Sequence, residues 1–274
     1  MKKAQRFTQA FTIIELLAVV GVIVLLASML LPAHARTKGA VRRILCSNNL
    51  RQVATAYHVW ALSHGDAFPM HVVAANGGYA DYTGQRIITP VQSTSRGVFG
   101  AFLVMSNELR APRILICPSE NEPRLPAMTF SEPNPTGSVN VVLFTNDLNT
   151  SYFIGVDAAV SRPRMFLAGD HNLGSDGNVV PMRGFVGAPT LYGPDFKVSL
   201  GTNFAPNAGV AWLNTMHTVQ GNVVLANGAV QQFTRSTLRS ALRNSGDTGG
   251  RQSGPNFSQP IGCTGPGVNR IQFP

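Results

Sequence analysis

Three side chains, Asp170, His171 and His217, could together support hydrolysis or bind a metal ion. A carboxylate beside imidazoles can orient a general base or coordinate a divalent cation. Their spacing is not diagnostic, and the chain contains no H-E-x-x-H, C-x-x-C, Walker A or G-x-S-x-G pattern. Charged residues make up only 13% of the chain, which leaves few titratable groups for catalysis. The sequence therefore predicts that the protein is not an enzyme, and it assigns no catalytic or metal-binding residue.

The three cysteines leave at least one thiol unpaired. Cys46 and Cys117 could form a disulfide if the body of the protein folds outside the cytoplasm, with Cys263 left free. The sequence does not fix this connectivity. In the alternative, Cys46 is a buried free thiol that packs like a small hydrophobic side chain.

An apolar run of 23 residues, from Phe11 to Ala33, is the element that most constrains function. As a helix it would span about 34 Å at about 1.5 Å per residue, enough for a hydrocarbon core of about 30 Å. Pro32 lacks a backbone donor and should bend the helix near the far interface. The net charge of +9 is concentrated in residues 1–51, and basic residues flanking an apolar run favour membrane insertion over nucleic-acid binding.

Glu15 is the single charged residue of that run. A carboxylate in hydrocarbon costs about 2.5–3.5 kcal/mol, so such a residue is a candidate for a functional role. If the chain were cut between Ala10 and Phe11, the new α-amino group of a neighbouring copy could neutralise Glu15. In the alternative, Glu15 lies at the level of the lipid headgroups.

A basic leader, a small residue and the run F-T-I-I-E-L-L from Phe11 resemble the class III signal of type IV pilins and type II secretion pseudopilins. The resemblance implies that a membrane prepilin peptidase cuts after Ala10 and methylates the amino group of Phe11. It also implies that Glu15 sets the register between subunits and that apolar helices form the filament core. The chain departs from the family in one respect, because Ala10 replaces the usual glycine.

A second cleavage is compatible with the same segment, because Ala33-His34-Ala35 is an A-x-A pattern. An ordinary signal peptidase could cut after Ala35 and release a soluble protein. The apolar run is long for such a signal and contains Glu15, which favours the membrane-anchored form.

Beyond the apolar run, a seam at spacings of three and four residues predicts that the helix continues to about Ser63. The seam consists of Cys46, Leu50, Val53, Tyr57 and Trp60. Short β-branched or aromatic runs separated by turn residues follow, including 151–156 and 165–168, and they are typical of antiparallel strands.

The strongest hairpin signal is Asn227-Gly228, which lies between two apolar runs within residues 221–233 and predicts a type I′ turn. A short helix is expected over 234–243. His217, followed after nine intervening residues by Asn227-Gly228, resembles the His-x9-Asp-Gly motif of a group of pseudopilin-like proteins, as do the pieces around Cys46, Cys117 and Asp170. The group's aspartate is a candidate Ca²⁺ ligand that Asn227 lacks. No cofactor is therefore assigned, and Ca²⁺ is the one ion left open.

Together these patterns predict an α+β, pilin-like fold in which a long N-terminal helix packs on an antiparallel sheet with long loops. Residues 1–10 are a basic leader, 11–33 a membrane helix and 34–64 its amphipathic continuation. Residues 65–243 form a globular body, and 244–274 a Gly/Ser/Pro-rich tail. The expected function is a non-enzymatic filament subunit in the cytoplasmic membrane, with the body outside the cytoplasm. Its expected partners are copies of itself or other pseudopilins, prepilin peptidase and membrane lipids, and no nucleic acid. A membrane-anchored binding module that does not polymerise is the alternative.

Overall fold

The computed structural model describes residues 12–82, 97–131, 142–175, 190–191, 197–199, 210–245, 252–254 and 270–274. The chain divides into two compact units, Met1–Val41 and Arg42–Pro274. The second unit contains helix and antiparallel sheet, so the expected α+β class is confirmed. Ala10, Phe11 and Cys263 lie outside the described residues.

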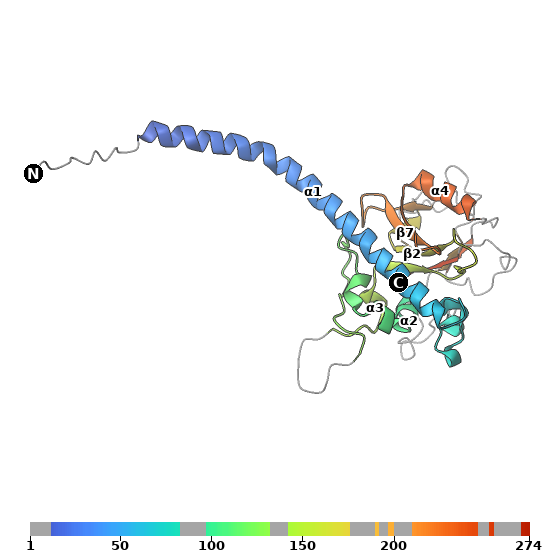
Figure 1. Cartoon of the computed structure of the whole chain (residues 1–274). Helices are drawn as coiled ribbons and strands as arrows, with labels where there is room; N and C mark the ends of the chain where they lie inside the picture. Colours follow the sequence, from blue (N-terminus) through green and yellow to red (C-terminus); the bar gives the residue numbers. More distant parts are fainter. Residues whose placement is uncertain are drawn as a thin grey trace, which may run out of the picture. The chain divides into compact units, whose positions relative to one another are not determined.

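One helix, α1 (Ile13–Leu62), links the two units in sequence (Figure 1). The sequence predicted a helix from about 11 to about 63, and the observed bounds agree with that expectation. The helical assignment continues through Pro32, where the bend remains a prediction. After Leu62 the chain enters a turn in which Gly65 and Asp66 adopt left-handed conformations with φ of 65° and 58°, and this reversal ends the helix.

Within the described residues, no helix has the combination of length and apolarity that crossing a bilayer requires. The membrane span expected over 11–33 therefore remains a prediction. In the part of α1 whose side chains are described, every large apolar residue from Ile13 to Leu26 is exposed.

The main sheet has seven strands in the order β8-β7-β2-β1-β10-β5-β9, and every neighbouring pair is antiparallel. Its strands are β1 (Tyr152–Gly155), β2 (Phe166–Asp170), β5 (Lys197–Ser199), β7 (Gly221–Leu225), β8 (Val230–Phe233), β9 (Gln252–Gly254) and β10 (Arg270–Gln272). A second sheet of three strands, in the order β4-β3-β6, consists of β4 (Thr190–Leu191), β3 (Leu173–Ser175) and β6 (Val210–Trp212). Strands β2 and β7 lie side by side near the middle of the body in Figure 1.

The central strands β1, β2 and β7 are buried on both faces, with successive side chains pointing to opposite sides of the main sheet. On β1, Tyr152 and Ile154 join a core that includes the buried face of α1, while Phe153 between them joins a second core. That second core contains Leu238 and Leu242 of α4 (Arg235–Asn244). The predicted helix seam is confirmed, since its five members are at most 3% exposed.

Short helical segments pack around these cores. They are α2 (Val98–Leu103), α3 (Ser106–Leu109) and the 3-10 turns Pro69–His71, Ala74–Asn76, Ala80–Tyr82, Pro112–Leu115 and Asp147–Asn149. Leu115-Ile116-Cys117-Pro118 has the composition of a strand end stopped by proline, but it forms no strand: Leu115 ends a 3-10 turn that begins at Pro112.

The stretch 244–274 differs from the expected flexible or loosely packed tail. Beyond the end of α4, its described parts include two strands of the main sheet: β9 pairs with β5, and β10 lies between β1 and β5. Ile271 and Phe273 are fully buried. A three-residue strand is specified by its partners rather than by its own composition, so the Gly- and Ser-rich surroundings concealed it.

Strands β7 and β8 form the predicted hairpin, but the predicted type I′ turn is wrong. Leu225 N donates to Ala229 O at 2.9 Å, and Gly228 N donates to Leu225 O at 2.8 Å, so the loop has three residues, 226–228. Only Gly228 has a positive φ, of 82°. This is the pattern of a three-residue hairpin closed by a left-handed glycine.

Candidate functional site

Four buried side chains with metal-binding or nucleophilic chemistry meet inside the second unit. They come from four segments: Cys46 from α1, Cys117 after the turn Pro112–Leu115, Asp170 from the end of β2 and His217 from the β6–β7 loop. Cys46 Sγ donates to Asp170 Oδ1 at 3.1 Å. His217 Nε2 lies 3.2 Å from Cys117 Sγ and 3.3 Å from Asp170 Oδ2. One ligand-type atom from each of the four residues lies within 4.8 Å of the others.

Strand pairing and helix packing position Asp170 and Cys46. Asp170 Oδ2 accepts from the backbone N of Asn222 at 2.6 Å and from its Nδ2 at 3.0 Å, which ties β2 to β7. Cys46 begins the buried seam of α1, and its Sγ lies 3.5 Å from the Tyr152 hydroxyl on β1. Both side chains are 0% exposed, so the site is fixed by the core itself.

The loop that carries His217 has an unusual backbone. His217, Thr218 and Val219 are consecutive left-handed residues with φ of 50°, 52° and 56°. This conformation costs about 1–2 kcal/mol per non-glycine residue. Asn172 Nδ2 compensates by donating to the carbonyls of Leu213, Met216 and Gln220, each at 3.0 Å. The side chain of Asn172 therefore clamps the loop in the shape that turns His217 inward.

Burial and mutual contact shift the pKa values of all four groups. Burial raises the pKa of the Cys46 thiol well above its ordinary value and also raises the pKa of Asp170. Burial opposes ionisation of Cys117 too, but hydrogen bonds with Cys46 and His217 outweigh it, so the pKa of Cys117 is lowered. Burial lowers the pKa of His217, yet contact with Cys117 and the charge of Asp170 raise it overall. Cys117 and His217 are thus biased toward a thiolate and an imidazolium.

A Cys-His-Asp arrangement invites comparison with a nucleophilic triad, and the geometry argues against one. In a triad the base uses one ring nitrogen toward the nucleophile and the other toward the acid. Here Cys117 and Asp170 both face Nε2 of His217. Cys117 is also only 1% exposed, so a substrate has no access to its sulfur. The groups converge on a common centre instead of forming a relay.

The structure separates Asp170 from its neighbour His171, which the sequence analysis considered together. His171 Nε2 lies 2.8 Å from Glu120 Oε2, and Arg124 Nη2 lies 3.3 Å from His171 Nδ1. Burial would raise the pKa of Glu120, but the hydrogen bond and charge of His171 outweigh it, so the pKa is lowered. Glu120, Glu122 and His171 thus form a second group of metal-ligand side chains, with the positive charge of Arg124 beside it.

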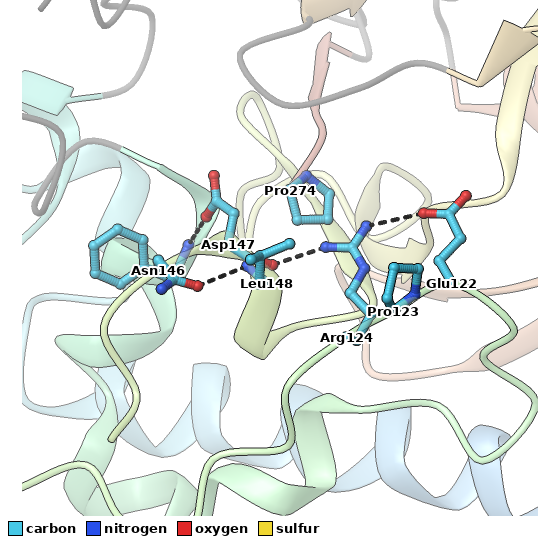
Figure 2. A pocket seen from close by; sticks show the side chains of 8 residues that line it. Glu122, Pro123, Arg124, Asn146, Asp147, Leu148 and Pro274 are labelled. Atoms are coloured by element: carbon cyan, nitrogen blue, oxygen red, sulfur yellow. Dashed lines mark hydrogen bonds and ion pairs between the residues drawn. The ribbon is translucent and has the colours of Figure 1, made fainter. Parts of the chain in front are cut away.

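A cavity of about 520 Å³ adjoins this second group, and Figure 2 shows the side chains that line it. Arg124 spans the cavity wall: its Nη2 lies 3.7 Å from Glu122 Oε2, and its Nη1 donates to the Asp147 carbonyl at 2.8 Å. Asp147 Oδ1 accepts from Phe99 N at 2.8 Å. These contacts organise the loops around the cavity, and we assign no chemistry to it.

Glu15 has a local role that the sequence analysis did not anticipate. Its Oε2 accepts from Thr12 N at 2.9 Å and from Thr12 Oγ1 at 2.7 Å, while Glu15 N donates to Thr12 Oγ1 at 3.4 Å. This is a capping box at the start of α1. The T-x-x-E spacing that predicts it is present in the sequence.

Comparison with protein-family models, curated proteins and solved structures gave no match. Function must be inferred from the residues. The structure brings the predicted pair Cys46 and Cys117 together, as free buried thiols. The side chain of His217 contacts the Cys117 thiol. In the hairpin, Asn227 Oδ1 accepts from Ala229 N at 3.0 Å.

Sequence reasoning missed the four-residue group as a unit. Each of its members lay in a separate sequence piece that had been singled out for its resemblance to pseudopilin-like proteins: Cys46, Cys117, Asp170 and His217. The one sequence feature that could have indicated the group is that each piece contains a residue of a type that binds metal ions. No local spacing linked them, because consecutive members are 71, 53 and 47 residues apart in the sequence.

Proposed function

We propose that the protein is a non-enzymatic, membrane-inserted subunit of a type IV pilus-like or type II secretion pseudopilus filament. The observation that carries the proposal is the division of α1 into two stretches of different chemistry. From Ile13 to Leu26 its large side chains are apolar and exposed, whereas from Cys46 onward one face is buried in the core of the second unit.

The first stretch is apolar around its whole circumference. The exposed side chains include Ile13 at 80% and Val24 at 62%. A helix that is apolar on all sides is stable only when lipid or other protein covers it. Lipid before assembly and neighbouring subunits afterwards meet that requirement, and Glu15 is the one charged group in the stretch.

The body supports a structural role. Its Cys-His-Asp group is buried and lacks the geometry of a triad. A filament needs a repeated heterologous contact between rigid bodies, and a sheet whose central strands pack against a core on each face provides such a body.

Determination of the mature N-terminus tests the proposal directly. The full chain is produced with a prepilin peptidase and analysed by mass spectrometry. We expect a mature chain that begins at Phe11 with a methylated amino group. A soluble, monomeric product that begins at Arg36 would overturn the proposal.

Two substitutions at Glu15 separate its capping role from its role as a charge. Glu15→Gln keeps a side chain that can accept in a capping box but removes the charge, whereas Glu15→Ala removes both. If the carboxylate pairs with a neighbouring amino group, both variants should abolish filament assembly in a shearing or pull-down assay. Normal assembly of Glu15→Gln would show that capping alone is the function of Glu15.

The second candidate function is a membrane-anchored module that does not polymerise. The capping box favours it, because Thr12 gives Glu15 a partner within its own chain. This candidate predicts a membrane-bound mature chain that remains monomeric on cross-linking.

A further inference from the structure

The donor atoms of the buried group are those that zinc prefers. Two sulfurs, an imidazole nitrogen and a carboxylate oxygen come from Cys46, Cys117, His217 and Asp170. Structural zinc sites take four such ligands in tetrahedral geometry and leave no open position. Thiolates select against Ca²⁺ and Mg²⁺, which bind oxygen ligands.

Three of the separations between donor atoms are close to those around one tetrahedral ion, and all four groups offer a donor atom within 4.8 Å of the others. Zinc lies about 2.3 Å from sulfur and about 2.0–2.1 Å from nitrogen or oxygen, which places neighbouring ligands about 3.3–3.8 Å apart. The separations are 3.1 Å from Cys46 Sγ to Asp170 Oδ1, 3.2 Å from Cys117 Sγ to His217 Nε2, and 3.3 Å from His217 Nε2 to the other carboxylate oxygen, Asp170 Oδ2. Movements of a few tenths of an ångström would complete the site.

The direction of the donors supports a shared centre. Nε2 of His217 faces both the Cys117 sulfur and the Asp170 carboxylate. A hydrogen-bonded chain would place these partners on different ring nitrogens. Convergence on one nitrogen is what a metal ligand requires, because that nitrogen points at the ion.

The surroundings of the group resemble an outer shell that orients ligands. Asn222 holds the Asp170 carboxylate through two hydrogen bonds, and Tyr152 contacts the Cys46 sulfur. Such partners fix the orientation of metal ligands. Zinc with two thiolates and one carboxylate has a net charge of −1. Arg43, one helical turn before Cys46, supplies a positive charge close enough to act on His217.

A Cys46–Cys117 disulfide is the competing use of the same thiols. It would engage the two sulfurs and leave the fully buried Asp170 with only Asn222 and His217 as partners for a carboxylate charge that burial disfavours. A zinc ion uses all four groups at once. It also offsets the cost of burying Asp170.

We propose that Cys46, Cys117, Asp170 and His217 bind one Zn²⁺ in a closed, structural site. The ion cross-links α1 to β2 and to the β6–β7 loop, and thereby fixes the C-terminal part of α1 within the second unit. Binding requires both sulfurs as thiolates and His217 as a neutral imidazole, so the protons that these groups carry are released to solvent. The site does not depend on whether the protein assembles into filaments.

Metal analysis of the full-length chain, purified in detergent without chelators, tests the proposal. We expect about one zinc per chain by elemental mass spectrometry. After removal of zinc, titration with Co²⁺ should give one equivalent of tetrahedral d–d bands and a thiolate-to-cobalt charge-transfer band. Folded protein that binds neither ion, or that contains a Cys46–Cys117 disulfide by peptide mapping, would overturn the proposal.

Variants locate the site. Cys117→Ser should lose about half of the charge-transfer intensity, and Asp170→Asn should weaken Co²⁺ binding by on the order of tenfold or more. Glu120→Gln is the matched control, because it removes a buried acid from the neighbouring group and should keep one zinc per chain. Loss of zinc in Glu120→Gln with retention in Asp170→Asn would assign the ion elsewhere. If a ligand variant fails to fold, the wild-type cobalt spectrum still decides the outcome.

Discussion

Asn172 is the residue on which the position of His217 depends. It is fully buried and satisfies three carbonyls of a loop with three successive left-handed residues. Loss of the amide would leave buried carbonyls without a donor, so Asn172→Ala should lower the free energy of unfolding by about 1–3 kcal/mol. Chemical denaturation measures this change.

The control for this prediction is Gln232→Ala. It removes an exposed hydrogen bond from Gln232 Nε2 to Gln220 Oε1 on the surface, and it should change stability by less than about 0.5 kcal/mol. Equal effects of the two substitutions would mean that the loop keeps its shape without the clamp.

Glu120 gives the protein a defined response to acid. Its pKa is lowered in the folded state from an ordinary value of 4.5, so it binds protons more readily in the unfolded chain. Its stabilising contribution is therefore complete above pH 4.5 and is lost as the pH falls through the lowered folded-state pKa. Glu120→Gln removes this titration.

Denaturation curves recorded on both sides of pH 4.5 test the expectation. The difference in free energy of unfolding between wild type and Glu120→Gln should be constant above pH 4.5 and should shrink in more acidic solution. Parallel curves at every pH would contradict the assigned pairing of Glu120 with His171.

At the scale of elements, the β7–β8 hairpin depends on one glycine. Gly228 has φ of 82°, and a Cβ built there would lie 3.7 Å from His58 Nε2, an ordinary contact. The cost of Gly228→Ala is therefore one of backbone conformation, about 1–2 kcal/mol in the free energy of unfolding. Thermal or chemical denaturation gives the value.

Asn227→Asp is the companion variant. An aspartate keeps an acceptor for Ala229 N, so we expect a change within about 0.5 kcal/mol. A larger loss in this variant than in Gly228→Ala would show that the asparagine amide, and not the glycine conformation, holds the turn.

Elements with a strong local pattern could be predicted from the sequence. Strand β1 and the β7–β8 hairpin carry β-branched and aromatic residues between turn residues, and α4 follows a capping threonine. Strand β10 has only three residues, and its place between β1 and β5 depends on partners distant in sequence. Local pattern contains no information about such pairing, so β10 could not be found.

The candidate site was predictable only in part. The seam of α1 placed Cys46 in the core, and the structure confirms it. The meeting of Cys46 with Asp170 and His217 depends on a bulged β2–β7 register and on a strained loop. Neither feature has a local signature, because both result from tertiary packing that overrides residue preference.

At the scale of the whole molecule, the main sheet is stabilised by cores on both faces, and β10 belongs to that interior. Ile271 is 0% exposed. Ile271→Ala should lower the free energy of unfolding by about 2–5 kcal/mol, through lost burial and the cavity that remains. Urea denaturation measures the loss.

The control is Leu125→Ala. Leu125 is 52% exposed, and its truncation should cost less than about 0.5 kcal/mol. If Ile271→Ala cost no more than this control, the last strand would not be part of the stabilising core.

The position of β10 in the main sheet also determines the order in which the strands can join that sheet during synthesis. Strands β8, β7, β2 and β1 form a contiguous group, but β5 and β9 join it only through β10. Ribosomes deliver residues 270–272 after every other described strand, so until then β1 keeps an open edge that can pair with another chain. In a nascent molecule of this protein, the edge of β1 therefore stays unpaired until the last strand has been synthesised.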